Sequence, residues 1–173
     1  MTGTDIDLVG AAPEGGAAPA AAAFRGEPSR NGRVAVALAV LAAAASVLWG
    51  VLASGNARTL TWLIAEHELL GALAGVSCGV VGAVVILHRP GHALGWLLVA
   101  EGQMQALSTM LAEYAAHRPA LPLTGAATFI GTYLWLPGMA VAAGLLTPLF
   151  PDGRPASRRW RPVVWVAATA VAL

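Results

Sequence analysis

The sequence predicts an all-α membrane protein: a helical bundle with four complete transmembrane helices, a truncated fifth helix and a cytoplasmic N-terminus. Three observations predict this fold class. Of the 173 residues, 57% are hydrophobic and 11% are charged, whereas soluble domains carry roughly 25% charged residues. Several uncharged runs reach the length of about 20 residues that a helix needs to cross a bilayer. All ten basic residues are arginines, and they gather in alternate loops.

Composition also excludes several functions. The net charge of +1 is too small for a typical nucleic-acid binder, which presents a strongly basic surface, so we expect no nucleic-acid partner. The one cysteine, Cys78, excludes an intrachain disulfide and a multi-cysteine metal site. Because it lies in an apolar run, we interpret it as a buried, unreactive thiol.

Residues 1–33 precede the first apolar run and are rich in Ala, Gly and Pro, with no helical or strand period. Such a segment buries too little apolar surface to offset the chain entropy lost on folding. We therefore expect a disordered cytoplasmic tail, followed by a transmembrane module over residues 34–173.

The apolar runs of this module are each interpreted as membrane helices, because a helix satisfies its own backbone hydrogen bonds where lipid offers no water. The third run is interrupted by Glu101 and Glu113. The fifth would cover only ~16 Å, about half a bilayer, so we expect the polypeptide to continue beyond residue 173. The predicted spans are residues 34–53, 69–87, 93–114, 126–150 and, incomplete, 163–173.

Arginine placement predicts the orientation, since loops rich in arginine stay in the cytoplasm. Only Arg58 and Arg118 fall in loops on the opposite side. The N-terminus is therefore predicted on the cytoplasmic side of the plasma membrane. The outer loops are too short to hold a folded ligand-binding domain. The arginines on the predicted cytoplasmic side are Arg25, Arg30, Arg33, Arg89, Arg154, Arg158, Arg159 and Arg161.

The second predicted span carries a ridge of small residues, Gly71, Gly75, Gly79 and Ala83, at a spacing of four. Such a ridge lets another helix approach closely. The spacing leaves two interpretations open: the partner helix belongs to the same chain, or it belongs to a second copy.

The third predicted span carries a polar stripe formed by Glu101, Gln105 and Ser108. An unpaired charge deep in a bilayer costs at least ~2.5 kcal/mol, so Glu101 must be protonated, hydrogen-bonded or exposed to a wet cavity. Three interpretations follow. The stripe is a polar packing contact, it is a site that senses a stimulus or moves a proton, or the predicted helix boundary is misplaced.

The fourth predicted span contains Pro137 near its middle, where proline frees the carbonyl of Tyr133 and predicts a kink. Elsewhere the sequence lacks the usual catalytic and nucleotide-binding motifs. His88 and His92 are four residues apart, but Pro90 and Gly91 break the helix that this metal-ligand spacing requires. We therefore expect no catalytic, cofactor-binding or metal-binding residue within the 173 residues.

Three stretches resemble one known family. Residues 88–98, HRPGHALGWLL, resemble an inner turn that usually reads RRPxNxIGWLL. Residues 149–155, LFPDGRP, resemble the family's FPDGR turn, and residues 157–165, SRRWRPVVW, resemble its SRRWRPVxW helix entry. The family is the N-terminal multi-spanning membrane module of bacterial two-component sensor histidine kinases, and the resemblance covers roughly residues 34–173. The sequence departs from the pattern at His92 and Glu101.

The resemblance implies a role in signal transduction as a sensory input module. A signal would pass by helix rearrangement to kinase domains outside these residues, where ATP and Mg would bind and where a phosphoryl transferase would act on a response regulator. It also implies a homodimer in the lipid bilayer. The cytoplasmic turn would anchor the chain at headgroups through its acid, its glycine and its arginines: Asp152, Gly153, Arg154, Arg158, Arg159 and Arg161.

Two other functions stay open at the level of sequence. In one, the chain is part of a membrane transporter or another membrane enzyme, and Glu101 lines a polar path for substrate or protons. In the other, it is a structural membrane protein.

Overall fold

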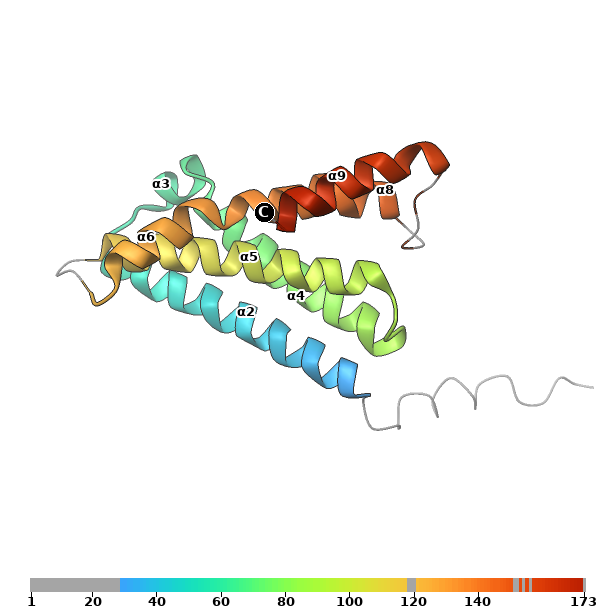
Figure 1. Cartoon of the computed structure of the whole chain (residues 1–173). Helices are drawn as coiled ribbons and strands as arrows, with labels where there is room; N and C mark the ends of the chain where they lie inside the picture. The colour runs from blue at the N-terminus through green and yellow to red at the C-terminus, as the bar shows by residue number, and fades with distance from the viewer. Residues whose placement is uncertain (1–28, 118–120, 151–152, 154, 156, 173) are drawn as a thin grey trace, which may run out of the picture.

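The computed structural model describes residues 29–117, 121–150, 153, 155 and 157–172, which form helices and no strand (Figure 1). In chain order the elements are α2 (Arg30–Gly55), α3 (Leu60–Ala65), α4 (Glu68–His88), α5 (Ala93–Ala116), α6 (Thr124–Tyr133), α7 (Trp135–Met139), the π-helix η2 (Ala140–Leu146), α8 (Thr147–Leu149), the 3-10 helix η3 (Arg158–Trp160) and α9 (Arg161–Ala172).

The membrane character of the chain rests on three segments. Within the described residues, Arg30–Gly55, Glu68–His88 and Thr124–Leu149 are long and apolar enough to cross a bilayer. Helix α5 is equally long, but its glutamates and glutamines make it less apolar, and it is not among the three. The all-helical membrane fold agrees with the sequence, while four complete spans and a fifth stay a prediction.

Helix α2 begins earlier than expected. The Ser29 hydroxyl accepts a hydrogen bond from the Gly32 amide at 3.1 Å, which caps the helix and places its first residue at Arg30. Residues 30–33, expected in the disordered tail, are therefore helical; residues 1–28 lie outside the described part of the chain. The buried face of α2 consists mainly of small residues three or four positions apart: Gly32, Ala35, Ala39, Ala42, Ala45, Trp49 and Ala53.

The glycine ridge of α4 packs within the same chain, mainly against α5. A Cβ added to Gly75 would lie 2.9 Å from the Cβ of Ala106, and one added to Gly102 would lie 2.6 Å from the Gly79 amide nitrogen. Gly79 also faces Ala42 of α2, at 3.4 Å. The two helices approach so closely only because neither backbone carries a side chain at these positions.

Helix α5 lies at the centre of the bundle and contacts α2, α4, α6, α7 and η2 (Figure 1). Its polar side chains reach its neighbours, as the Gln103 amide does by donating to the Leu38 carbonyl of α2 at 2.5 Å. Buried apolar clusters lie on both sides of it. Val99 packs with Ile86 and Ala35, and Leu94 packs with Val141.

The segment expected as one kinked span, residues 126–150, changes helix type along its length. The α-helix pauses at Leu134 and gives way to a π-helix over Ala140–Leu146. Pro137 has no amide hydrogen to give the Tyr133 carbonyl, so the regular hydrogen-bond ladder is interrupted where proline predicts it. We call residues 124–149 the interrupted helix.

Helix α9 packs against this π-helix. A Cβ added to Gly144 would lie 2.7 Å from the Cβ of Ala167. In the connection before α9, Gly153 adopts a φ of 72°, a left-handed conformation that glycine adopts without steric cost. Arg158, Arg159 and Arg161 are exposed, while Asp152 and Arg154 lie outside the described residues.

Candidate functional site

A cavity of about 830 Å³ lies between the start of α4, the middle of α5 and the interrupted helix. We call it the Glu101 cavity. It brings together the whole polar stripe predicted from the sequence, since Glu101, Gln105 and Ser108 all line it. The α3–α4 turn adds polar residues that the sequence did not connect with the stripe, namely Glu66, His67 and Glu68.

Glu101 is the most deeply placed charged group of this cavity, with an exposed fraction of 4%. Its Oε1 accepts a hydrogen bond from Gln105 Nε2 at 2.9 Å, one helical turn away. Its Oε2 is buried and has no hydrogen-bond partner among the described residues. No arginine or lysine lines the described walls, so one carboxylate oxygen is left for a proton, a water or a ligand.

Gly138 of α7 makes room for this carboxyl group. A Cβ at Gly138 would lie 2.9 Å from Glu101 Oε2 and 3.3 Å from Gln105 Nε2. Pro137 precedes Gly138, and the π-helix begins at Ala140. The buried carboxyl group therefore contacts the interrupted helix beside its change of hydrogen-bond pattern, a kind of irregularity that is frequent at functional sites.

Ser108 has a different role from its neighbours in the stripe. Its hydroxyl donates a hydrogen bond of 2.7 Å to the Gly131 carbonyl of α6. At the same contact, a Cβ on Gly131 would lie 2.8 Å from the Ala112 amide nitrogen. Ser108 thus holds α6 against α5 and closes one wall, while Glu101 and Gln105 supply the polar interior.

A second polar cluster joins the α2–α3 connection to the end of α5, and sequence reasoning missed it. Glu113 has an exposed fraction of 1%. Its carboxylate accepts hydrogen bonds from Arg58 Nε at 3.0 Å and from Asn56 Nδ2 at 2.6 Å. The Arg58 guanidinium also lies 4.0 Å from the ring centre of Trp62, and His117 Nδ1 lies 3.0 Å from Asn56 Oδ1. We call this group the Arg58–Glu113 clamp.

One signal in the sequence could have found the clamp. An acid inside an apolar run needs a partner, because a buried unpaired charge is expensive, and Arg58 is one of only two arginines predicted at that end. The groups that donate hydrogen bonds to the Glu113 carboxylate, Asn56 and Arg58, both come from the α2–α3 connection. The clamp therefore fixes the shape of the bundle end, and the Glu101 cavity remains the candidate site.

Metal binding has no geometric basis in the described part of the chain, where no group of three or more His, Cys, Asp or Glu residues lies close enough to share an ion. His88 Nδ1 lies 2.8 Å from the Val84 carbonyl within its own helix. His92 lies beyond the break at Pro90 and Gly91, at the N-cap of α5.

Comparisons with protein-family models, with curated proteins and with solved structures gave no match to this chain.

Proposed function

We propose that this chain is the membrane-embedded input module of a bacterial sensor histidine kinase. In this proposal the Glu101 cavity receives the stimulus, and the interrupted helix passes it on. The observation that carries the proposal is the contact between Glu101 Oε2 and Gly138, which joins an unpaired buried carboxyl group to the least regular helix of the bundle. The three stretches that resemble the kinase family support the same function.

The proposal includes α5 as a fourth complete span that crosses the bilayer inside the bundle. Its polar groups face other helices, as the buried Glu101, Ser108, Thr109 and Glu113 indicate, so lipid need not solvate them. With the N-terminus in the cytoplasm, the Arg58–Glu113 clamp lies at the outer surface. The Glu101 cavity then opens in the outer half of the bilayer, near the α3–α4 turn.

A chain of close contacts leads from Glu101 to the opposite end. Gly138 of α7 touches its carboxyl group, the π-helix follows, and Gly144 of that π-helix packs against Ala167 of α9. A π-helix differs from an α-helix by a shift of one residue in its hydrogen bonds. Such a shift would move α9, which in our proposal leads toward dimeric kinase domains that bind ATP and Mg and phosphorylate a response regulator.

The main alternative is a transporter with a polar path through Glu101. The polar lining of the cavity favours it, but the helix below Glu101 does not continue the path. Toward the cytoplasmic end of α5, Leu94 and Leu98 line a separate cavity with mainly apolar walls, and Val99 is buried in an apolar cluster. We therefore favour a receptor cavity that ends at Glu101 over a polar path that crosses the whole bilayer.

The test is autophosphorylation of the full-length protein in native membranes. Glu101→Gln keeps the size of the side chain and removes its charge, and Gly138→Ala places a methyl group against it. We expect both variants to change the phosphorylation level per molecule, after correction for the membrane abundance of each variant. Gly125→Ala is the matched control, since a Cβ there meets nothing within 4 Å. Absence of ATP-dependent histidine phosphorylation in the wild type, or equal levels in all variants, would refute the proposal.

A further inference from the structure

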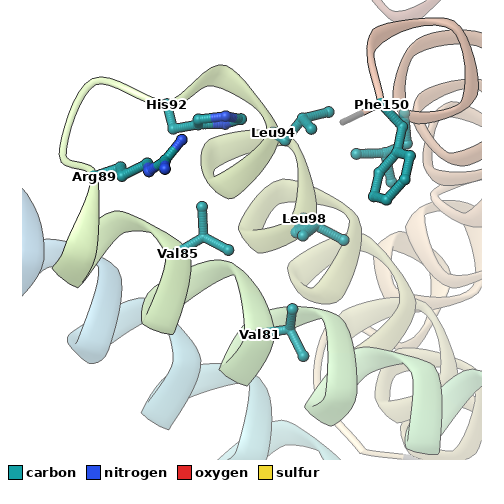
Figure 2. A pocket seen from close by; sticks show the side chains of 8 residues that line it. Val81, Val85, Arg89, His92, Leu94, Leu98 and Phe150 are labelled. Carbon is teal, nitrogen blue, oxygen red and sulfur yellow. The ribbon is translucent and has the colours of Figure 1, made fainter. Parts of the chain in front are cut away.

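A second cavity, of about 510 Å³, lies at the opposite end of the bundle from the clamp, between the end of α4, the start of α5 and the end of the interrupted helix (Figure 2). We call it the Arg89 groove. Its walls are apolar: Val81 and Val85 come from α4, Leu98 from α5, and Leu146 and Phe150 from the interrupted helix and the residue that follows it.

Two nitrogen-rich side chains stand at the rim of this groove. Figure 2 shows the Arg89 side chain extending toward His92 across the α4–α5 turn, with both side chains above Val85. Within the described residues, no hydrogen bond or ion pair engages the Arg89 guanidinium. His92 Nδ1 is buried and likewise has no hydrogen-bond partner there. No acid lines the described walls, so the rim is suited to an anion.

The depth of the groove matches a lipid tail. Arg89 and Val81 are eight residues apart at the end of α4, a rise of about 12 Å along a helix. This distance is close to the thickness of one leaflet of hydrocarbon, about half of ~30 Å. A headgroup phosphate at the rim would therefore leave an acyl chain lying along Val85, Val81 and Leu98.

We propose that the Arg89 groove binds one anionic phospholipid, with its phosphate at Arg89 and His92 and one acyl chain in the groove between the α4–α5 pair and the end of the interrupted helix. The guanidinium donates charge-assisted hydrogen bonds to the phosphate oxygens, and His92 Nδ1 gains the partner that the protein does not supply. Free phosphate would satisfy the rim but would leave the apolar walls uncovered. The inference is independent of the sensor function, since it requires only that the chain resides in a membrane.

The experiment measures lipid binding to the whole chain in detergent by native mass spectrometry, with phosphatidylglycerol and phosphatidylcholine as probes. We expect one tightly retained phosphatidylglycerol and no equivalent phosphatidylcholine. Arg89→Gln should weaken phosphatidylglycerol retention roughly tenfold, as expected for a lost hydrogen bond to a charged group. Arg33→Gln is the matched control, because Arg33 is also an exposed arginine at this end of the bundle, where Ala35 packs with Ile86, but does not line the groove.

Two further arms separate the phosphate from the tail. Val85→Trp fills the groove below the rim and should also release phosphatidylglycerol, and circular dichroism confirms that each variant keeps its helices. Equal retention by the Arg89→Gln and Arg33→Gln variants, or equal retention of both lipids by the wild type, would overturn the proposal. Displacement of the lipid by inorganic phosphate, with no effect of Val85→Trp, would identify a phosphate site and overturn the lipid assignment.

Discussion

The unpaired Oε2 of Glu101 lies against Gly138, where an added methyl group would come within 2.9 Å of it. The contact joins a buried carboxyl group of the central helix to the interrupted helix, one residue after Pro137. Neither partner can be enlarged or moved without affecting the other, so this pair is the most informative place to perturb the molecule.

Substitution Gly138→Ala should destabilise the protein by about 1–3 kcal/mol, the usual cost of forcing extra atoms into a packed interior. Combining it with Glu101→Ala should recover part of this loss, because the shortened side chain no longer meets the new methyl group. Thermal unfolding in detergent measures both effects. Gly125→Ala serves as control, and equal stability of the Gly138 and Gly125 variants would contradict the contact.

Breaking the Arg58–Glu113 clamp should be more costly. Arg58→Ala leaves Glu113, which is 1% exposed, without its counter-charge, and removing one partner of a buried pair typically costs about 3–5 kcal/mol. Because 29% of the Arg58 side chain is exposed, we expect a value at the lower end of this range. The double variant Arg58→Ala/Glu113→Ala should lose less than the sum of the two single variants. Strict additivity in denaturant unfolding would show that the pair is not coupled.

A bulky substitution tests whether the glycine ridge packs against α5 of the same chain or against a second copy. Gly75→Leu forces a side chain into the backbone of α5, where Ala106 lies within 3.1 Å of even a Cβ. We expect misfolding or degradation of the monomer in the membrane. Gly50→Leu, on α2 with no atom within 4 Å of its Cβ, should be tolerated. If Gly75→Leu instead leaves a stable monomer and removes only a cross-linked dimer, the ridge faces a second copy.

Water access to the Glu101 cavity can be mapped with cysteines in a Cys78→Ala background. Ala74 and Ala112 line the cavity, so cysteines there should react with a small water-soluble thiol reagent. A cysteine at Ala106, which is 0% exposed, should stay unreactive although it lies on the same helix as Ala112. Mass spectrometry after timed labelling measures the reaction at each of the three cysteines. Equal protection at all three positions would contradict a water-accessible cavity.

Much of the architecture was predictable because it depends on local properties. Apolar length and capping residues determine where a helix runs, so α2, α4 and the interrupted helix lie close to their predicted ranges. The spacing of four placed the ridge on one face of α4, and a similar period placed Glu101, Gln105 and Ser108 on one face of α5. Pro137 marked the interruption because it removes a hydrogen-bond donor wherever it occurs in a helix.

The sequence by itself therefore determined the helices, their apolar character and the two patterned faces, since each follows from residues within a few turns of one another. Only the tertiary structure decided what those faces meet. Glu113 and Asn56 are 57 positions apart. The space for Glu101 Oε2 depends on the missing side chain of Gly138, which lies on another helix. Such pairings depend on how whole helices pack, and the free energy of packing depends on every contact of a helix at once, which no short pattern of residues contains.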